Sequence, residues 1–560
     1  MAADRIPTHE ALALQIKRLG AEYVFGLMSE ETAQLIASID SCGVRFCSAR
    51  HENNAVAMAE GYASASGRLG IALIGRGPAT ANGLHGLVYA RKTGSRVLVL
   101  LGAGTDAPPN PNGFGPDTKA LDASAVLQGA GVRHMVAHDP ESAPQMLAQA
   151  AAAASHGLMA LLLPMNVLNG MAPASAGCEA IVLTAPSRQA APREAAISAA
   201  TALLQRARKP LIVSGVGAHR AGAAEAIARL ADHIGAALCT TMKAKDMFRG
   251  HPFDCGVLGS FSHSAGRRLI EQADCILVFG AGLNQRTTSQ GTSLPAGTPL
   301  IQVDISREAI GRWLHCDVAV AGDARAVAEA LMAAVPPRQE EDKMLRSDGN
   351  RRILAEYRPE LDFEARHTPR TIDPRTVGVE LDRMLPADRN VVYDAGNFLS
   401  VAAYVSVPGP AHIKQASDFS SIGMGFGTAL GFACGDRHRV TVLFIGDGAF
   451  LMTMSELETA AREGIPLVIV LMNDCAYGAE LHFLKLRDMP LATTQFPDID
   501  YAPVAEAFGF RAATVRTVEE LRRLGGLLAA PDGPVFIDCK INGAVAAAFL
   551  EETAPKRSKT

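Results

Sequence analysis

Short runs of consecutive apolar residues alternate along the chain with longer, alanine-rich segments of helical period. The runs lack the polar–apolar alternation of a strand with one solvated face, so both faces of each strand should be buried. Parallel sheets covered by helices on both sides have this pattern, and the sequence therefore predicts an α/β fold. The expected strands are Val97–Leu101, Leu158–Leu163, Leu211–Val213, Cys275–Phe279, Leu300–Val303, Val391–Tyr393, Val440–Ile445, Leu467–Met472 and Val535–Ile537.

Two stretches of different composition divide the chain into three units. Met171–Arg193 is rich in Pro, Ala and Ser, and Pro336–Arg370 is charged and contains prolines, so we interpret both as linkers. The three units between them have ordinary domain size, and we expect each to be a Rossmann-like α/β domain with a parallel sheet. The predicted domains are residues 1–170, 190–335 and 370–545, followed by a tail at 546–560.

Composition and charge exclude several classes of protein. Lys and Arg number 53 against 57 Asp and Glu, which gives a net charge of −4 and argues against a nucleic-acid binder or a polybasic membrane anchor. The apolar runs are far shorter than the ~18 residues of a membrane helix. The beginning of the chain lacks the apolar run of a signal peptide, and ten cysteines without a CxxC pair indicate reduced thiols. We therefore expect a cytoplasmic protein.

A glycine-rich turn follows one of the strands expected in the third unit. Strand Val440–Ile445 runs into residues 446–449, which read Gly-Asp-Gly-Ala. Glycines let backbone N–H groups approach an anion closely, and the start of a helix favours a phosphate. The helix expected after the turn carries Ser455 and Glu458 at the spacing of a capping box. This pattern suits a phosphate-bearing ligand.

A second acidic residue follows the next strand. Strand Pro466–Met472 runs into residues 473–476, which read Asn-Asp-Cys-Ala. Asp447 and Asp474 should therefore lie at the carboxyl ends of neighbouring parallel strands, where α/β folds bind ligands. Two carboxylates and a backbone carbonyl suit a hard cation such as Mg²⁺ that also holds a diphosphate.

This arrangement resembles the thiamine-diphosphate (ThDP) binding motif, in which a Gly-Asp-Gly turn is followed further along by a pair of asparagines. The resemblance implies that Asp447 and Asp474 are metal ligands and that Ala476 lends its backbone carbonyl. Asp474 departs from the family because it stands where the second asparagine usually lies, which changes charge more than geometry. A chance turn is the alternative, but the flanking strand, helix and second ligand argue against it. The residues implied to bind the cofactor in this turn are Gly446, Gly448 and Ala449.

A segment of the first unit carries the other half of the resemblance. Strand Val44–Ser48 leads into a helix whose apolar stripe begins at Ala55, and Glu52 lies at its start. The stretch is similar to the Arg-His-Glu…Ala-Glu-Gly-Tyr-Ala segment of the acetolactate-synthase-like ThDP enzymes. Glu52 matches their catalytic glutamate, which exchanges a proton with the aminopyrimidine ring of the cofactor. Alone, Glu52 would be interpreted as an acid at a helix N-terminus; beside the ThDP motif we prefer the catalytic interpretation.

Two further segments resemble cofactor-binding parts of the family. Residues 420–427 contain its Met-Gly-Phe-Gly segment, so Gly423 and Met424 are implied to contact the cofactor, with Met424 as the side chain that wedges it into a bent form. A core methionine is the alternative for Met424. Residues 394–398 resemble the diphosphate-side segment, in which Asn397 keeps a polar group and Phe398 replaces the common histidine.

The middle unit resembles the central domain of the same enzymes. Gly215 and Gly217 with Gly222 do not form a proper GxGxxG motif, and no acid follows at the ribose-binding distance, so we interpret the unit as structural. Some relatives carry FAD here. Residues 284–286 match that pattern only in part, which argues against FAD without excluding it. A nucleotide or a coenzyme A moiety is an equally open alternative for this domain.

The loops that choose a substrate depart from the family. Met28 and Glu30 lie where relatives often have a glycine-rich turn, and a charged residue there is unexpected for a small apolar acyl pocket. Arg76 is a candidate to hold a substrate carboxylate or phosphate, or else to pair with Glu30. Asp122 stands where acetolactate synthases usually have glutamine, which weakens a strict acetolactate synthase assignment.

Together these motifs identify the chain as a member of the acetolactate-synthase-like ThDP enzymes. The resemblance implies pyrimidine-binding, central and diphosphate-binding domains, and an active site shared between subunits of a homodimer or homotetramer. We predict ThDP- and Mg²⁺-dependent decarboxylation of a 2-oxo acid with carboligation to an acyloin-type product. Two alternatives remain: a ThDP-dependent lyase of a 2-hydroxy ketone or 2-hydroxyacyl-CoA, and a non-catalytic paralogue.

Overall fold

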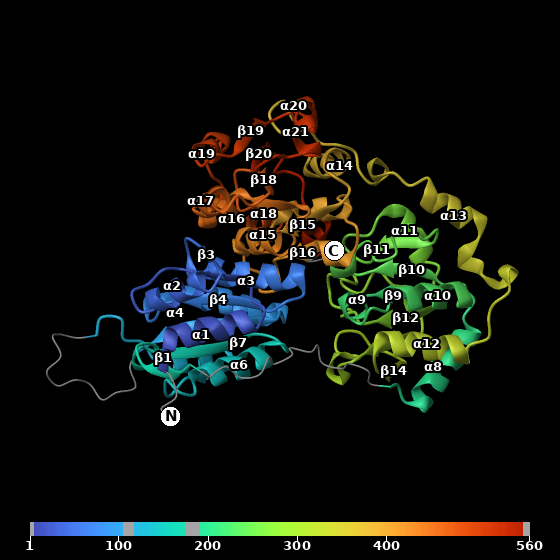
Figure 1. Ribbon diagram of the computed structural model, residues 1–560. Coiled ribbons are helices and arrows are strands. Elements are labelled where there is room, and N and C mark those ends of the chain that lie inside the picture. The colour runs from blue at the N-terminus through green and yellow to red at the C-terminus, as the bar shows by residue number, and fades with distance from the viewer. Residues whose placement is uncertain (1–4, 105–116, 175–190, 553–560) are drawn as a thin grey trace.

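Three six-stranded parallel sheets organise the chain (Figure 1). The structure is a computed structural model that describes residues 5–104, 117–174 and 191–552. Helices cover both faces of each sheet, and all nine strands expected from the apolar runs are present, with ends that differ by a few residues. Continuous apolar strands form here because both faces of each sheet are buried. The prediction of three Rossmann-like α/β domains is confirmed.

The N-terminal domain has the strand order β3-β2-β4-β5-β7-β6, with a small antiparallel ribbon of β1 and β8 beside it. The elements of this domain are β1 (Arg5–Pro7), α1 (Thr8–Arg18), β2 (Tyr23–Gly26), α2 (Ala33–Ser41), β3 (Arg45–Ser48), α3 (Glu52–Ser66), β4 (Gly70–Ile74), α4 (Pro78–Thr93), β5 (Val97–Ala103), α5 (Ala123–Gly129), β6 (His134–Val136), α6 (Ala143–Ala154), β7 (Met159–Pro164), α7 (Met165–Leu168) and β8 (Met171–Pro173).

The central domain has the strand order β11-β10-β9-β12-β13-β14. From the centre of the sheet, β9, β10 and β11 follow one another toward one edge, and β12, β13 and β14 follow one another toward the other. This is the doubly wound order of dinucleotide-binding domains. Its elements are α8 (Glu194–Arg206), β9 (Pro210–Ser214), α9 (Val216–Arg220), α10 (Ala224–Ile234), β10 (Ala237–Thr240), β11 (Asp254–Val257), α11 (Ser264–Ile270), β12 (Cys275–Phe279), β13 (Leu300–Asp304), β14 (Val318–Ala321), α12 (Ala324–Ala334) and α13 (Asp348–Ala355).

The C-terminal domain has the order β16-β15-β17-β18-β20-β19. If the strands of each terminal domain are numbered along the chain, both sheets follow the same order, as a duplication would produce. The elements are α14 (Pro374–Met384), β15 (Arg389–Tyr393), β16 (Ile413–Gln415), α15 (Met424–Gly435), β17 (Val440–Gly446), α16 (Asp447–Thr453), α17 (Glu456–Arg462), β18 (Leu467–Asn473), α18 (Gly478–Lys485), α19 (Ala502–Ala507), β19 (Arg511–Val515), α20 (Val518–Arg523), α21 (Gly525–Ala529), β20 (Val535–Lys540) and α22 (Ala548–Glu551).

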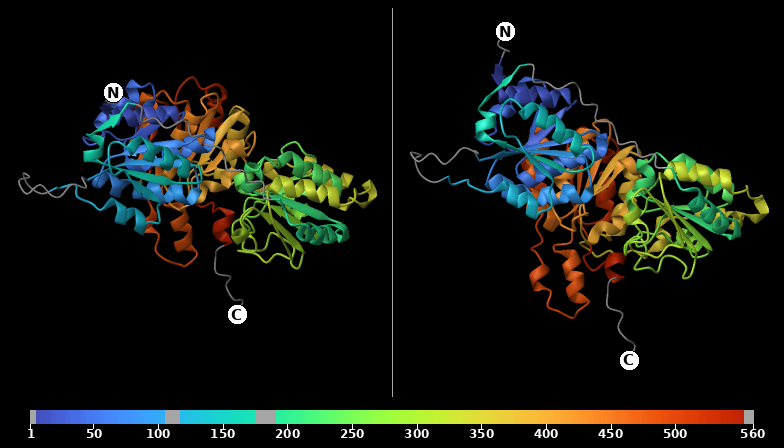
Figure 2. Two further views of the ribbon diagram at one scale, coloured as in Figure 1. Left: turned by 60° about the horizontal axis from the view of Figure 1, so that its bottom comes forward. Right: turned by 90° about the horizontal axis from the view of Figure 1, so that it is seen from below.

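The two terminal domains pack against each other, and the central domain lies to one side (Figure 2). Helices α3 and α15, which occupy equivalent places in the two domains, form this contact. A Cβ atom added at Gly431 would lie 1.8 Å from the carbonyl oxygen of Met58, and one at Gly61 would lie 2.0 Å from that of Thr428. The glycines therefore let two helix backbones touch, and an ion pair between Lys414 and the buried Glu60 reinforces the contact.

Three local predictions are wrong. The second predicted linker contains helix α13. Leu345 within that stretch is buried in the core of the central domain, because the few apolar residues among the charged ones pack against that domain. The predicted tail contains helix α22, whose Phe549 and Leu550 are buried. Ser455 and Glu458 form no capping box; Glu458 instead pairs with Arg50 of the N-terminal domain and with Arg462.

The first predicted linker begins as strand β8, and its residues 175–190 lie outside the described part of the chain. Each cysteine in the described part is a free thiol. Within the same ranges, no helix combines the length and the apolar character needed to cross a membrane.

We expect Gly431→Ala to destabilise the protein, because its methyl group would force the two helix backbones apart. Overpacking of this kind costs about 1–3 kcal/mol of unfolding free energy. Thermal or urea unfolding measures the effect. Gly526→Ala is the matched control, since Gly526 lies in helix α21 with open space around its missing Cβ, and it should be neutral or slightly stabilising. Equal stability of the two variants would contradict the packing argument.

Candidate active site

Three aspartates follow adjacent strands at the carboxyl edge of the C-terminal sheet. Asp394 comes after β15, Asp447 begins α16 directly after β17, and Asp474 comes directly after β18. The strands are hydrogen-bonded neighbours in parallel, so their ends meet at one edge, as the sequence predicted. The edge borders a cavity of about 600 Å³ that the C-terminal and central domains line together.

Asp447 and Asp474 form a close pair of carboxyl groups in this cavity. Burial raises the pKa of both, and the charge of Asp447 raises that of Asp474 further. The backbone N–H of Ala476 opposes the rise for both groups, so the two carboxyls converge on the same peptide. Among the ion pairs of the described residues, neither carboxylate has a basic partner. The chain therefore supplies no cation for this pair, and a bound metal ion would stabilise its ionised form.

The donor set fits a magnesium ion. Two carboxylates and the carbonyl of Ala476 are hard oxygen donors, and a diphosphate would complete the coordination. The described residues hold no group of three or more His, Cys, Asp or Glu side chains arranged for a metal, so a third protein ligand to such an ion would be a backbone oxygen. Cys475 has a φ of 55°, a left-handed conformation that costs energy for a residue with a side chain and turns the chain between Asp474 and Ala476.

Asp394 anchors the start of helix α15. Its two carboxylate oxygens accept hydrogen bonds from the backbone N–H groups of Ala395 (2.6 Å), Gly423 (3.0 and 3.1 Å) and Gly425 (2.8 Å). Burial raises the pKa of Asp394 to about 7, and these three donors oppose that rise. Gly423 has a φ of 90°, so a residue without a Cβ suits the turn that leads into the helix.

The other residues predicted to contact the cofactor differ in whether they line the cavity. Asn397 lines the cavity, but its amide donates to the carbonyl of Val545 (2.9 Å) and accepts from the N–H of Ala547 (2.8 Å), so it holds the chain before α22. Met424 is buried against Ala57, Tyr89 and Ala416, and neither it nor Gly423 lines the cavity. Gly446, Gly448 and Ala449 do line it.

The central domain supplies the opposite wall of the cavity. Arg286 faces it, and its guanidinium lies 4.6 Å from the ring centre of Phe549 in α22. Burial lowers the pKa of Arg286. Gly215, Gly217 and Gly280 lie where the loops after β9 and β12 cross: a Cβ at Gly215 would be 2.3 Å from the carbonyl oxygen of Gly280. Backbone packing therefore accounts for these glycines without a bound phosphate.

The candidates in the N-terminal domain gather at the carboxyl edge of its own sheet. Glu52 begins α3, is buried, and accepts a hydrogen bond from the amide of Asn82 (3.3 Å). Met28 and Glu30 follow β2 and are exposed. Among the residues that the structure describes, neither these three nor any other of this domain lines the cavity beside the Asp447–Asp474 pair of the same chain. One chain alone thus keeps Glu52 apart from the Asp447–Asp474 pair.

Arg76 and Asp122 at this edge have local partners. Arg76 pairs with Asp117 (2.7 Å) and Glu31 (3.4 Å), so the alternative of an ion pair with Glu30 is wrong: the neighbouring acid, Glu31, is the one that turns inward. Asp122 caps helix α5 by accepting a hydrogen bond from the N–H of Ala125 (2.9 Å).

Three family models match the chain along its length. They describe the N-terminal TPP binding domain (residues 7–109), the central domain (197–331) and the C-terminal TPP binding domain (394–539) of thiamine pyrophosphate enzymes, TPP being another name for ThDP. The chain belongs to the thiamine pyrophosphate enzyme family. Within it, the chain resembles the acetolactate-synthase-like enzymes that act on 2-oxo acids, and its two TPP-binding domains indicate ThDP as the cofactor.

Similar proteins of this family carry different activities. A probable 2-ketoarginine decarboxylase of Pseudomonas aeruginosa is 28% identical over 526 residues, 92% of this chain and 90% of that protein. A sulfoacetaldehyde acetyltransferase of Castellaniella defragrans is 27% identical over 534 residues, 90% and 87% of the two chains. An acetolactate synthase of Arthrospira platensis is 25% identical over 564 residues, 96% and 95% of the two chains.

Sequence reasoning missed two features of this thiamine pyrophosphate enzyme. Arg286 was noted only as part of an incomplete flavin pattern, and its place in the cavity depends on how two domains meet. Asp538 and Lys540 lie inside the last strand of the C-terminal sheet and are buried. The sequence could have indicated this pair. Two charged residues two positions apart in an apolar strand lie on the same face, and buried charges on that face need partners of opposite charge.

We expect Asp394→Asn to lower stability and weaken ThDP binding. One carboxylate oxygen would become an NH₂ group facing a buried backbone N–H, and an unpaired buried donor costs about 1–3 kcal/mol. Thermal unfolding and ThDP titration measure the two effects. Asp323→Asn is the matched control, because a single oxygen of Asp323 accepts both cap hydrogen bonds of α12 and asparagine retains it. If both variants behave alike, Asp394 does not anchor α15 as described.

Proposed function

We propose that the protein is a ThDP- and Mg²⁺-dependent enzyme that decarboxylates a 2-oxo acid and ligates the remaining acyl unit to an acceptor, giving an acyloin-type product. The observation that carries this proposal is the cavity itself, which has the uncompensated Asp447–Asp474 pair on one wall and the Arg286 guanidinium on the other. The pair suits the cation of a metal–diphosphate. The guanidinium suits the carboxylate of a 2-oxo acid or of an acceptor.

Each group of the chain then has a defined task. Asp447, Asp474 and the carbonyl of Ala476 would hold Mg²⁺ and with it the diphosphate. Bound there, ThDP would supply the electron sink for breaking the bond between a carbonyl carbon and its neighbour. Arg286 orients the substrate carboxylate, and Phe483 and Phe549, which also line the cavity, limit its access to water.

We further propose that Glu52 acts in the active site of a partner subunit. Glu52 lies at the edge of its domain, outside the cavity of its own chain. A second copy that brought this edge to the cavity would place Glu52 near the cofactor, where it would move the proton that ThDP activation requires. Met28, Glu30, Arg76 and Asp122 lie on the same edge and would reach the substrate side together with it. This arrangement makes a homodimer the minimum and permits a homotetramer.

The first test is incubation with ThDP, Mg²⁺ and pyruvate, with 2-ketoarginine and longer and aromatic 2-oxo acids in parallel. We expect CO₂ release and an acyloin-type product, measured by mass spectrometry. Absence of CO₂ from every 2-oxo acid, with ThDP bound, would redirect the assignment to cleavage of a 2-hydroxy ketone or 2-hydroxyacyl-CoA.

In this assay, Arg286→Met should raise KM for the 2-oxo acid about 10- to 100-fold, since a hydrogen bond between charged groups contributes about 1.5–3 kcal/mol. Arg312→Met is the control, because Arg312 also stacks on an aromatic ring, that of Trp313, without lining the cavity. Equal KM values for the two variants would remove Arg286 from the substrate site.

The shared site predicts complementation between two inactive variants. Glu52→Gln removes the proton-transfer group and Asp447→Ala removes a metal ligand, so we expect each homomeric variant to lose nearly all turnover. A mixed dimer would contain one site with both changes and one with neither. Random mixing by denaturation and refolding should therefore restore about a quarter of wild-type activity, because half of the dimers are mixed and half of their sites are intact.

Two results would contradict this arrangement. Full turnover by Glu52→Gln would exclude its proton-transfer role. No recovery on mixing, in a preparation shown by native mass spectrometry to contain mixed dimers, would place both residues in a site within one chain.

A further inference from the structure

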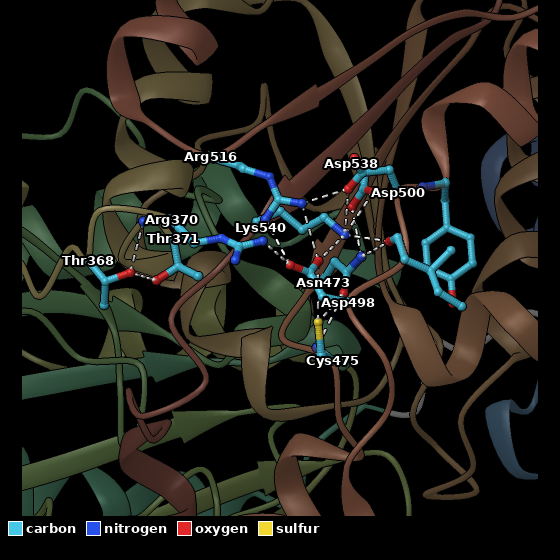
Figure 3. A network of polar contacts seen from close by, with 12 residues as sticks. Thr368, Arg370, Thr371, Asn473, Cys475, Asp498, Asp500, Arg516, Asp538 and Lys540 are labelled. Carbon is cyan, nitrogen blue, oxygen red and sulfur yellow. Dashed lines mark hydrogen bonds and ion pairs between the residues drawn. The ribbon is translucent and has the colours of Figure 1, made fainter.

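Lys540 is a buried cation that the proposed reaction does not use. It ends strand β20, and its side chain is 1% exposed. The ammonium pairs with Asp498 (3.0 Å), Asp500 (3.3 Å) and Asp538 (3.3 Å), and it also donates to the carbonyl of Ile499 (Figure 3). A buried cation is retained only when its partners compensate for lost hydration. Three carboxylates around one ammonium supply that compensation.

One of these carboxylates connects Lys540 to the turn that carries Asp474 and Ala476. Asp538 is fully buried and accepts hydrogen bonds from the amide of Asn473 (2.9 Å) and the N–H of Tyr501 (2.9 Å). The amide oxygen of Asn473 in turn accepts from the N–H of Cys475 (3.2 Å). Cys475 is the left-handed residue between Asp474 and Ala476. The chain of contacts therefore runs from Lys540 through Asp538 and Asn473 into the turn that presents the ligands.

A second connection reaches the same turn from its other side. The N–H of Phe496 donates to the carbonyl of Cys475 (2.7 Å), and the N–H of Tyr477 donates to the carbonyl of Thr494 (2.8 Å). Residues 494–500 thus form a strip bonded to the turn, and Asp498 and Asp500 end this strip. Lys540 pairs with both of these aspartates. It therefore holds two structures in place: this strip, and Asn473 through Asp538.

The charges in this network balance. Asp498, Asp500 and Asp538 face Lys540, Arg516 and Arg370. Arg516 pairs with Asp498 and Asp500, and Arg370 pairs with Asp498, from the exposed side. Among the ion pairs of the described residues, Lys540 alone reaches Asp538. Replacing Lys540 would leave a buried carboxylate without a cation, whereas replacing Arg516 would leave exposed ones.

We infer that Lys540 is a positioning residue for the metal site, holding the Asp474–Ala476 turn in place through Asp538 and Asn473. The inference rests on the proposed Mg²⁺ and ThDP binding. The amide nitrogen of Asn473 donates to Asp538 (2.9 Å) and to the carbonyl of Ile499 (3.4 Å), both of which Lys540 also contacts, and these bonds turn its oxygen toward the N–H of Cys475. Without Lys540 the buried charge of Asp538 draws other donors, the amide loses its fixed orientation, and the strained turn relaxes.

Lys540→Met tests this role in the full-length protein. Titration of Mg²⁺ at fixed ThDP, followed by calorimetry, should show affinity about 10- to 100-fold weaker than wild type, the usual cost of losing a residue behind a metal ligand. Arg516→Met is the matched control, because it removes a cation from the same network on its exposed side; its Mg²⁺ affinity should change by less than about threefold. Lys540→Arg keeps the charge and should recover most of the affinity.

Kinetics at saturating Mg²⁺ separate positioning from general destabilisation. The turn is restored when the ion is bound, so kcat of Lys540→Met should approach wild type, while the Mg²⁺ concentration needed for half-maximal rate rises with the calorimetric constant. If Lys540→Met does not fold, Asn473→Ala interrupts the same path beyond the buried pair and should show the same loss of affinity.

The outcomes distinguish the two levels of the argument. If wild type shows no Mg²⁺-dependent ThDP binding, the proposed function itself fails. If wild type binds but Lys540→Met or Asn473→Ala binds Mg²⁺ as tightly as Arg516→Met, the positioning role of Lys540 is overturned and the proposed function stands.

Discussion

Mutual repulsion between two carboxyl groups, Asp447 and Asp474, is the constraint around which the C-terminal domain is organised. The parallel sheet brings them together because adjacent strands end at one edge. Burial makes their charges costly, and no basic side chain among the described residues pairs with them. A folded chain keeps such a pair only where something other than stability requires it. The surroundings bury the pair without neutralising it, which leaves that task to a cation.

The relation between the terminal domains explains why a catalytic site could be divided between them. Both sheets have the same strand order, and their equivalent helices α3 and α15 touch along glycines. Each sheet presents its carboxyl edge as a place for a ligand, one with Glu52 and the other with the aspartate pair. The helix contact fixes the two edges of one chain in different places, since Glu52 stays outside the cavity that its own aspartates border. In the dimer that we propose, a second copy brings unlike edges together.

The fold and the placement of the aspartate pair could be predicted because their signals are local. Continuous apolar runs specify buried parallel strands, and the Gly-Asp-Gly turn and Asp474 each follow such a run directly. Helix α22 and the lining of the cavity by Arg286 depend on contacts between segments far apart in the chain, so no local pattern showed them. Arg76 shows the same limit on a smaller scale. Glu30 was the partner considered from the sequence, whereas the direction of the backbone after β2 brings the adjacent Glu31 to Arg76.

The neutral network beside the aspartate pair completes the physical argument. Asp538 adds to the negative potential at Asp447, so the region would be still more unfavourable if Asp538 were uncompensated. Lys540 neutralises it from within the core, where solvent does not screen the interaction. The domain thus contains two kinds of buried charge within a few residues of each other. The charge of Asp538 is balanced by Lys540, and this pair holds the turn in place. The Asp447–Asp474 pair has no cation from the chain. The held turn stabilises this second arrangement, because it keeps the two repelling carboxylates from moving apart before a cation binds.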